Sequence, residues 1–526
     1  MKLLTRFAVP ALLLLAPTCI TKVGGQATDL PQAPAAPKNV IVLIADGSGF
    51  NMLQATRLWS GEPLVVDGPE WRKLAQATYA LRSGGALRGD LGPLDQDPGM
   101  AYDAARLYDV EPIEGEFTIR LSGKEVPYVR GFAGYEMLRR TAPDSAATAS
   151  AMMTGVRTYN GAINVDGGRE PVEAVSEVAH QLGKRVGVVS TVPWTHATPA
   201  AAGGAHNASR SNYEEIAAEI LSAGVVDFLA GAGNPDYDSN ARPRSKPSYS
   251  YIGEADWLAL KQGTRADATG EPWTLVQDTE AILALAQGPV PESVVVMPRA
   301  GTTFQQKRTP ALDRNDDGRR NGADVFESAP GDDPRLEGLP TLPDLARAAL
   351  NAVDDDPDGF FLMIEGGAVD WAMHNNQLGR AIEEYLEFNE TIRTVCDYLD
   401  AGTNGHNWEN TLVVVTADHD HLLYGPDADR IPFQELEDRG KGKMPGYRWL
   451  SNGHSNNLVP LFARGAGSDR FVAIADEVDE FQIAERTLGR GPYLHQSELG
   501  LLLKAFIRGE DAPQRAPERV VTGSGR

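Results

Sequence analysis

Candidate metal ligands adjoin five long apolar runs of this chain. Near-continuous runs of Val, Ile and Leu are typical of buried parallel strands. Such strands bring their carboxyl ends to one edge of a sheet, where ligands bind. Donors from distant segments would therefore meet in one place, which predicts a site for several metal ions. The runs and their candidates are VIVLIADG with Asp46, VGVVSTVPWTHATP with His196 and Thr198, FFLMIEGGAVDWAMH with Glu365, Asp370 and His374, LVVVTADHDH with Asp418 and His419, and LVPLFARG, which follows His454.

The residue types in this set suit two kinds of ion. Asp370 and His374 are four residues apart, so a helix would present them on one face. Zinc accepts His and Asp in open catalytic sites, whereas the oxygen donors of Asp46, Thr198 and Glu365 suit magnesium. A single strand-end carboxylate often only caps the next helix, and a single histidine often only forms a hydrogen bond. The prediction therefore rests on the joint pattern at one sheet edge.

A serine that could act as a nucleophile stands at a predicted helix start. In PDSAATASAMMTG, small helix-forming residues follow Asp144 and Ser145. Free N–H groups and the positive dipole end of a helix would hold a phosphate there and stabilise a serine alkoxide. The alternative is that Asp144 or Ser145 only caps the helix. The chain has no Gly-x-Ser-x-Gly elbow, so the sequence does not support a lipase-type hydrolase.

The elements that must position these residues alternate along the chain. Helical patterns separate the strand candidates, and the clearest is Gln377 to Leu399, which carries one apolar stripe. The alternation predicts an α/β fold with a doubly wound, mostly parallel central sheet and helices on both faces. The expected strands begin at Asn39 and cover Arg185–Ser190, Val225–Ala230, Val294–Met297, Gly359–Ile364, Thr411–Thr416 and Val459–Ala463.

Length and charge limit the classes of function. The chain has 526 residues, which is too many for one simple hydrophobic core and favours a large α/β domain with insertions. The formal net charge of −23 argues against a nucleic-acid-binding module, since that affinity comes from clustered Lys and Arg. No stretch after the N-terminus is long and apolar enough to be a transmembrane helix. We expect one catalytic domain over 39–510, with insertions near 82–130, 234–343 and 424–448 and a flexible tail over 511–526.

The N-terminus has the features of an export signal. Lys2 and Arg6 precede the apolar stretch from Phe7 to Leu15, which is too short to span a membrane. We expect a signal peptide over 1–27, a Pro- and Ala-rich linker over 28–38, and a periplasmic or secreted protein. Lipoprotein anchoring through Cys19 is the alternative, but the preceding Thr18 fits lipoprotein cleavage poorly.

Seven ordered motifs give the chain a family resemblance. From about residue 39 to 465 the chain closely resembles the alkaline phosphatases, and the motifs that carry the resemblance are IADGSG, PDSAATASAMMTG, THATPA, AHNASR, IEGGAVDWAMH, TADHDH and GHSNNLVPLFARG. The resemblance implies two zinc ions, a third site for magnesium or zinc, and a serine that becomes phosphoserine. It assigns the nucleophile to Ser145, phosphate binding to Arg210, the first zinc site to Asp370, His374 and His454, the second to Asp46, Asp418 and His419, and the magnesium site to Asp46, Thr198 and Glu365.

The chain also departs from the family pattern. The segment between Thr198 and Arg210 is one residue longer than usual. His196 and Trp371 occupy positions that vary in the family. The resemblance places His196 around the magnesium site and Trp371 near the substrate, whereas His421 is expected to support a metal ligand or to be solvated.

A separate acidic segment matches the calcium-loop template. Asp324 replaces the usual Glu at its last position, and Arg320 stands where an apolar residue usually anchors the loop. The alternative is an acidic, Gly-containing surface turn. A structural calcium ion would be bound by Asp313, Asn315, Asp317, Arg319, Asn321 and Asp324.

These observations favour an exported alkaline phosphatase that hydrolyses small phosphate monoesters through a phosphoserine intermediate. One alternative is a phosphodiesterase on the same scaffold. Another is a calcium-stabilised extracellular binding protein with a degenerate site. A sulfatase is disfavoured because no Cys/Ser-x-Pro-x-Arg motif is present, and phosphoglycerate mutase relatives need no signal peptide. Family members are often homodimers, although no interface can be read from the sequence.

Overall fold

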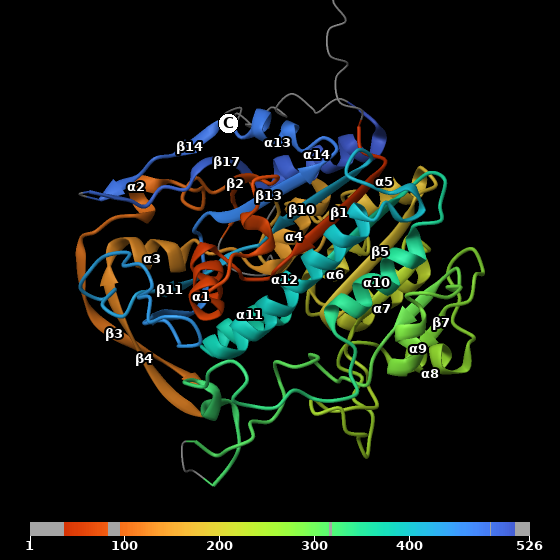
Figure 1. Ribbon diagram of the computed structural model, residues 1–526, viewed down its shortest axis with the longest axis horizontal. Coiled ribbons are helices and arrows are strands. Elements are labelled where there is room, and N and C mark those ends of the chain that lie inside the picture. Colours follow the sequence, from red (N-terminus) through yellow and green to blue (C-terminus); the bar gives the residue numbers. More distant parts are fainter. Residues whose placement is uncertain (1–35, 83–94, 315–317, 484, 511–526) are drawn as a thin grey trace, which may run out of the picture. The chain divides into compact units, whose positions relative to one another are not determined.

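The apolar runs form the centre of an eleven-stranded sheet in the part of the chain that the computed structural model describes, residues 36–82, 95–314, 318–483 and 485–510 (Figure 1). The expected signal peptide and C-terminal tail, and most of the linker, lie outside these residues. In spatial order the strands are β14 (Glu477–Asp479), β17 (Gly491–His495), β2 (Arg72–Ala77), β13 (Val459–Gly465), β10 (Thr411–Thr416), β1 (Asn39–Ile44), β9 (Phe360–Glu365), β5 (Arg185–Pro193), β6 (Phe228–Ala232), β8 (Val294–Val296) and β7 (Thr274–Val276).

Three neighbouring parallel strands, β1, β9 and β10, end at one level. Ile44 of β1 pairs with Thr416 of β10 on one side and with Glu365 of β9 on the other, and Glu365 pairs in turn with Ser190 of β5. All six residues of β1, β9 and β10 are buried, as their continuous apolar sequences require. The register therefore brings the segments that follow β1, β9 and β10 to the same edge of the sheet.

The expectation of parallel strands is wrong for β13, which runs antiparallel to both β10 and β2. The chain leaves β10 at the site edge and returns through the antiparallel pair β11 (Asp420–Tyr424) and β12 (Arg448–Ser455), so it enters β13 from that same edge. A parallel strand would need a crossover to the opposite edge. The reversal explains why His454 precedes its apolar run while the other candidates follow theirs.

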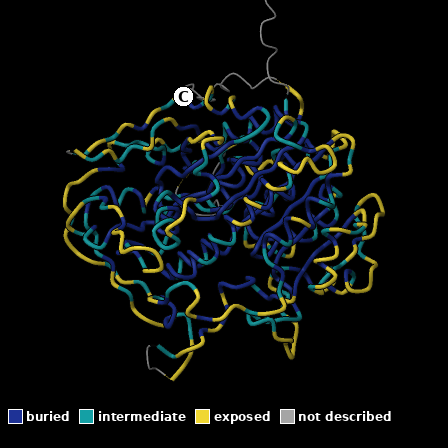
Figure 2. The backbone as a smooth tube through the Cα atoms, viewed as in Figure 1, coloured by how far each residue is buried: buried dark blue, intermediate teal, exposed yellow. Residues whose placement is uncertain are grey.

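Helices cover both faces of the sheet, which confirms the predicted doubly wound α/β fold. Val40, Val42 and Ile44 pack into one core, and Ile41 and Leu43 pack into the other. Figure 2 shows this buried centre inside more exposed connections. The first core includes α4 (Ser145–Thr154), α5 (Val175–Gln181), α6 (Ala197–Ala202), α7 (Tyr213–Ala223) and α14 (Gln496–Arg508), and the second includes α1 (Phe50–Ser60), α9 (Thr279–Ala284), α10 (Leu342–Val353), α11 (Ala368–His374) and α12 (Leu378–Asp400).

The insertions contain elements that the sequence did not indicate. Region 82–130 contributes most of a long antiparallel hairpin of β3 (Pro112–Leu121) and β4 (Lys124–Phe132). Region 234–343 was expected to hold one short strand, but it also contains β7, α8 (Glu254–Gln262) and α9. A three-residue strand such as β7 is too short to show a sequence period. Among the described helices, none combines the length and apolar character needed to cross a membrane.

Buried ion pairs attach the end of the second insertion to α12. Arg380 of α12 donates to Asp333 at 2.9 Å, and both side chains are only 2% exposed. Arg308 donates to Glu383 of α12 at 2.7 Å. Removing one partner of such a pair leaves an uncompensated buried charge.

We therefore expect Asp333→Ala to lower the free energy of unfolding by about 3–5 kcal/mol, measured by denaturant titration. Asp469→Ala is the matched control because its partner Arg72 and Asp469 itself are both well exposed. That control should change stability by less than about 1 kcal/mol. Equal effects of the two substitutions would contradict the anchoring role of Asp333.

Candidate active site

The shared sheet edge gathers the candidate ligands. Asp46 follows β1, Glu365 is the last residue of β9, and Thr198 lies in α6 beyond β5. The remaining candidates lie in α11 (Asp370, His374), between β10 and β11 (Asp418, His419), in β11 (His421) and in β12 (His454). Gly47 makes the turn after Asp46 possible, because its φ is +73° and an added Cβ would lie 3.2 Å from Asp370.

Asp370, His374, His421 and His454 form one cluster of candidate metal ligands. The Nδ1 atoms of His374 and His454 lie 2.6 and 2.8 Å from the carbonyl oxygens of Asn452 and Pro143. A carbonyl only accepts, so Nδ1 is the protonated nitrogen in each ring. When both rings are neutral, each Nε2 atom therefore carries a lone pair, and the two Nε2 atoms face each other at a distance of 2.9 Å. Such an arrangement needs a cation between them, either a proton or a metal ion.

The Asp370 carboxylate is the centre of this cluster. Its Oδ1 lies 2.7 Å from Nε2 of His421 and 3.3 Å from Nε2 of His454, and its Oδ2 lies 3.4 Å from Nε2 of His374. Burial would raise the pKa of Asp370, but the surrounding imidazoles hold it well below its usual range. Burial lowers the pKa of the His421 imidazole to about 3. His421 is thus a buried partner of Asp370 and not a solvated residue.

A second cluster consists of Asp46, Asp418 and His419. Nε2 of His419 lies 3.2 Å from Oδ2 of Asp418 and 3.4 Å from Oδ1 of Asp46. Burial, followed by repulsion from Asp418, Asp370 and Glu365, raises the pKa of Asp46 well above its usual range. Burial also raises the pKa of Asp418 to about 6. The two carboxylates are therefore costly to ionise together without a compensating cation.

Several buried oxygen atoms near these clusters lack hydrogen-bond partners. Among the described residues, neither carboxylate oxygen of Asp46, nor Oε1 of Glu365, nor the Thr198 hydroxyl has one. The other oxygen of Glu365 accepts from the Ser190 hydroxyl, and burial raises the Glu365 pKa to about 8. Unpaired buried oxygens are rare in folded proteins and are commonly explained by an ion. The donors therefore fit divalent cations.

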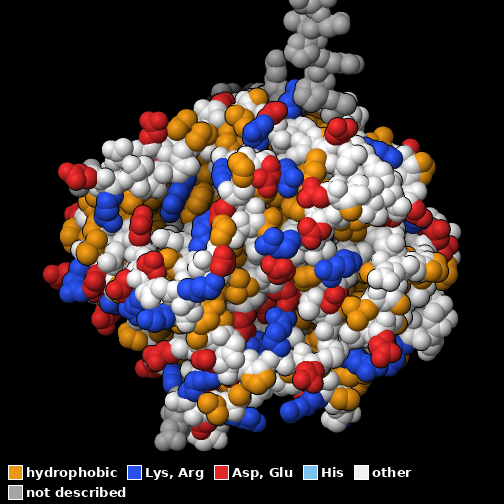
Figure 3. Space-filling view, in the orientation of Figure 1, with side chains coloured by type: hydrophobic (Ala, Val, Ile, Leu, Met, Phe, Trp, Pro, Cys, Tyr) orange, Lys and Arg blue, Asp and Glu red, His pale blue; other side chains and the backbone are white. Residues whose placement is uncertain are grey.

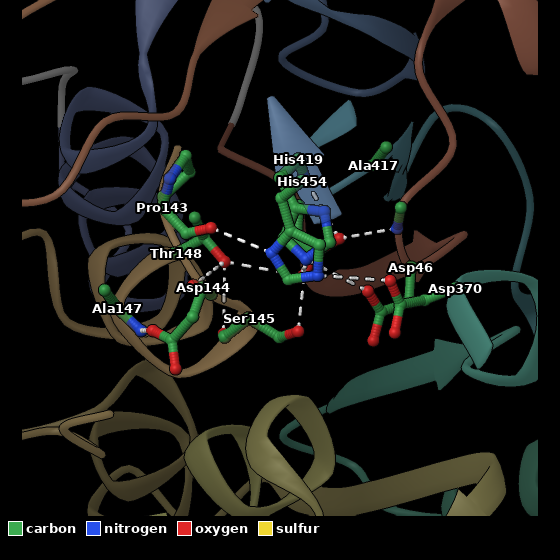
Figure 4. A network of polar contacts seen from close by, with 12 residues as sticks. Asp46, Pro143, Asp144, Ser145, Ala147, Thr148, Asp370, Ala417, His419 and His454 are labelled. Carbon is green, nitrogen blue, oxygen red and sulfur yellow. Dashed lines mark hydrogen bonds and ion pairs between the residues drawn. The ribbon is translucent and has the colours of Figure 1, made fainter. Parts of the chain in front are cut away.

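Ser145 is the first residue of α4, and Asp144 is the N-cap. Oδ1 of Asp144 accepts from the backbone N–H groups of Ala147 and Gly161, both at 3.0 Å. Because Asp144 caps the helix, the Ser145 hydroxyl is left to point toward the second cluster, and Figure 4 shows this orientation. Its Oγ lies 3.1 Å from Nε2 of His419.

Arg210 lies beside the serine despite the longer segment before it. Its Nη1 donates to Oδ2 of Asp144 at 3.1 Å, and its Nη2 lies 3.3 Å from Nε2 of His196. Burial, and then the Arg210 charge, lowers the pKa of His196 to about 3, so this imidazole is neutral. The Trp371 ring meets His196 edge to face, with centroids 5.3 Å apart. Arg210, His196 and Trp371 line one open pocket, together with Ser145, Lys307, Asp370, His374, Asn375 and His454.

Sequence reasoning did not identify three contacts of this site. Asp144 orients Arg210 as well as capping α4, and Ser190 binds Glu365. Their positions beside Ser145 and near the end of β5 are the only signals that could have indicated these roles. Lys307 enters the pocket from the polar insertion, and its Nζ lies 5.6 Å from the centroid of the Trp371 ring. No spacing or motif indicates it.

The expected calcium loop stays a prediction. Residues 315–317 lie outside the described residues, so Asn315 and Asp317 are not placed. Oδ2 of Asp313 accepts from the Gly318 N–H at 2.8 Å, and the Asp324 carboxylate accepts from the N–H groups of Arg314 and Asn321. These contacts tie together the described residues on either side of 315–317. The side chains of Arg319 and Asn321 lie in the same segment.

Comparison with known proteins identifies alkaline phosphatases as relatives of this chain. The alkaline phosphatase family model matches residues 119–438. Alkaline phosphatases 3 and 4 of Bacillus subtilis are each 30% identical to the chain, over 71% and 66% of its length. These matches span 64% of the first relative, which is less than two thirds of its length, and 77% of the second. Alkaline phosphatase of Escherichia coli K12 is 25% identical over 86% of each chain.

Solved structures share the fold. A cold-active alkaline phosphatase from a psychrophilic Shewanella species superposes with a TM-score of 0.56 and 20% identity, covering 90% of this chain and all of that one. Alkaline phosphatase from Thermus thermophilus gives a TM-score of 0.54 at 17% identity, covering 93% of this chain and 95% of that one. Since the family model matches more than half of the chain, this protein belongs to the alkaline phosphatase family.

Proposed function

We propose that this protein is a metal-dependent phosphomonoesterase, an alkaline phosphatase that releases inorganic phosphate through a phosphoserine intermediate. The observation that carries the proposal is the Ser145 hydroxyl. It stands at the start of α4, 3.1 Å from Nε2 of His419 at the edge of the second ligand cluster. Arg210 lines the same pocket. Nucleophile, cationic clamp and metal donors thus converge on one opening.

The residues of this site would act in two displacements. Ser145 Oγ attacks phosphorus as its proton passes to solvent, so a bond forms between them, the bond from phosphorus to the ester oxygen breaks, and the leaving alkoxide takes up a proton from solvent. Water then attacks the phosphoserine, and inorganic phosphate leaves as Ser145 regains its proton. The Arg210 guanidinium binds two nonbridging oxygens, and Asp144 and His196 hold it in place.

The donor sets divide between three ions. We assign Asp370, His374 and His454 to one zinc ion, and Asp46, Asp418 and His419 to a second. Bound there, divalent ions would lower the pKa of the attacking hydroxyl and offset the charge that develops at phosphorus. Asp46, Thr198 and Glu365 provide only oxygen donors and suit magnesium, although a third zinc ion remains compatible with them.

A phosphodiesterase on the same scaffold is the second candidate. Arg210 favours the monoester, because its planar donor pair matches a dianionic phosphoryl group whose nonbridging oxygens are all free. A binding protein with a degenerate site is less consistent with the geometry. Each of the residues assigned to the two zinc ions lies in one of the two ligand clusters.

We also propose that the protein is exported to the periplasm or secreted. The support is the basic and apolar N-terminal sequence, which resembles a cleavable signal. Small phosphate monoesters would be its substrates there. A homodimer is proposed from the family alone, and a structural calcium ion from the loop sequence alone.

Replacing the nucleophile gives the first test. We expect Ser145→Ala to reduce hydrolysis of p-nitrophenyl phosphate by at least about a thousandfold, because no other hydroxyl would form the intermediate. Ser150→Ala, which removes a buried hydroxyl from the same helix, is the control and should keep the activity. Full activity of folded Ser145→Ala protein would exclude the assigned nucleophile.

Arg210→Lys should weaken competitive inhibition by inorganic phosphate by about tenfold or more, because lysine cannot form the bidentate contact. Preference for p-nitrophenyl phosphate over bis-p-nitrophenyl phosphate should fall as well. Arg393→Lys, at an exposed position on α12, is the matched control. An unchanged inhibition constant in Arg210→Lys would remove Arg210 from the phosphate site.

Metal removal should destabilise the fold. Zinc at about a hundred times its dissociation constant should raise the free energy of unfolding of chelator-treated protein by about 2.7 kcal/mol per site. Without metal, Asp46→Asn should unfold at a higher denaturant concentration than the natural protein at pH 8. The reason is that a buried carboxyl group whose pKa is raised destabilises the fold at pH values above the ordinary pKa of that group.

With zinc bound, the natural protein should be more stable than Asp46→Asn, since an amide is a poorer metal ligand than a carboxylate. Glu390→Gln, on the exposed face of α12, controls for loss of one negative charge. A natural protein whose unfolding midpoint does not respond to chelator or zinc would argue against the assigned metal sites.

A further inference from the structure

We infer that the pocket continues past Lys307 into a second, cationic subsite, which binds an anionic group on the alcohol portion of the substrate. The preferred substrates would then be phosphate monoesters whose alcohol carries a further phosphate. This inference rests on the proposed phosphomonoesterase activity and specifies its substrate class. Three observations support the subsite: the placement of Lys307, a second hollow beside the catalytic pocket, and the charges that line this hollow.

Lys307 is held over the pocket by its two neighbours in the chain. The Gln306 side chain is buried and donates to the carbonyl oxygen of Trp371 at 3.4 Å. The Arg308 side chain is 1% exposed and is fixed by Glu383 of α12 at 2.7 Å. Lys307 between them is exposed, and its ammonium group lies over the Trp371 ring. The backbone therefore presents this one cation at a fixed place on the pocket wall.

A second hollow begins where the catalytic pocket ends. Lys307 and Asn375 line both hollows, so the two adjoin at these side chains. The rest of the lining includes groups that donate hydrogen bonds, among them the Arg320 guanidinium and the Gln377 amide, beside the apolar Pro310 and Val325. Ser122, at the tip of the β3–β4 hairpin, lines its far side.

The charge of this hollow is opposite to that of the chain. The formal net charge is −23, and acidic and basic side chains mix over the face seen in Figure 3. Among the described residues that line the second hollow, none is Asp or Glu. Arg308 is already paired with Glu383. Lys307 and Arg320, which form no ion pair within the described residues, remain to attract an anion.

The catalytic pocket alone does not need these two cations. Arg210 and the metal sites would bind the phosphoryl group beside Ser145, whereas Lys307 and Arg320 belong to the insertion that contacts α11 and α12. A monoester bound with its phosphorus at Ser145 would direct its alcohol portion into the open pocket. An anion on that portion would then meet Lys307 first and Arg320 beyond it.

The test compares monophosphates and bisphosphates of a series of straight-chain diols, from butanediol to decanediol, with the metal-loaded full-length protein. After correction for two equivalent phosphates, the ratio of kcat/KM for bisphosphate to that for monophosphate should exceed one and peak at one chain length. In Lys307→Gln and Arg320→Gln this ratio should fall by about fivefold or more, mainly through KM. Lys307→Arg should restore it, and raised salt should reduce it in the natural protein.

Lys443→Gln removes the same charge from an exposed turn outside both hollows and should leave the ratio unchanged. An equal ratio in the natural protein and in both Gln variants would overturn the subsite. A fall in kcat/KM that is the same for monophosphates and bisphosphates would also overturn it, because it would place Lys307 at the reacting phosphate. Failure of the natural protein to hydrolyse any monophosphate would instead reject the proposed function.

Discussion

The concentration of buried negative charge at one sheet edge is the constraint on which this structure depends. Asp46, Asp370, Asp418 and Glu365 lie within a few residues of strand ends and are almost fully buried. Burial raises the pKa values of Asp46, Asp418 and Glu365, and repulsion from neighbouring carboxylates adds to the effect. A fold can hold such a group only if cations or protons compensate it. The imidazoles around Asp370 and the unpaired oxygens around Asp46 indicate how the chain accommodates cations.

The sheet explains why this charge is gathered so closely. Pairing of Ile44 with both Thr416 and Glu365 ends three strands at one level, and antiparallel β13 brings His454 to the same edge. On this rigid frame, α4 places Ser145 and α11 places Asp370 and His374. The second insertion adds to the wall of the pocket, whereas no insertion contributes a described residue to the two ligand clusters. Lys307 is one such contribution.

The sequence predicted the parts of this arrangement that a local pattern determines. Apolar runs indicate buried strands, and their ends indicate where polar side chains must emerge, so Asp46 and Glu365 could be proposed from the chain alone. The four-residue spacing of Asp370 and His374, which indicates one face of a helix, is also a local pattern. What the sequence could not supply depends on tertiary pairing. The antiparallel direction of β13 follows from the return through β11 and β12, which no periodicity records.

The same limit applies to side-chain roles. Asp144 was recognisable as a cap, but its contact with Arg210 depends on where the chain folds back after α6. His421 was expected either to support a ligand or to be solvated, and only its 2.7 Å contact with Asp370 decides between these. Lys307 lies in a polar insertion, where a lysine is ordinarily a solvated surface residue. Its position depends on buried contacts of its neighbours with α11 and α12.

The central claim is that phosphate passes through a covalent bond to the protein, and the stereochemistry at phosphorus tests it most directly. The measurement is transfer of an isotopically chiral phosphoryl group from a monoester to an acceptor alcohol by the metal-loaded protein. Two in-line displacements, the first by a serine oxygen, predict retention of configuration. Inversion would show a single direct displacement and would contradict the role of Ser145 as the nucleophile.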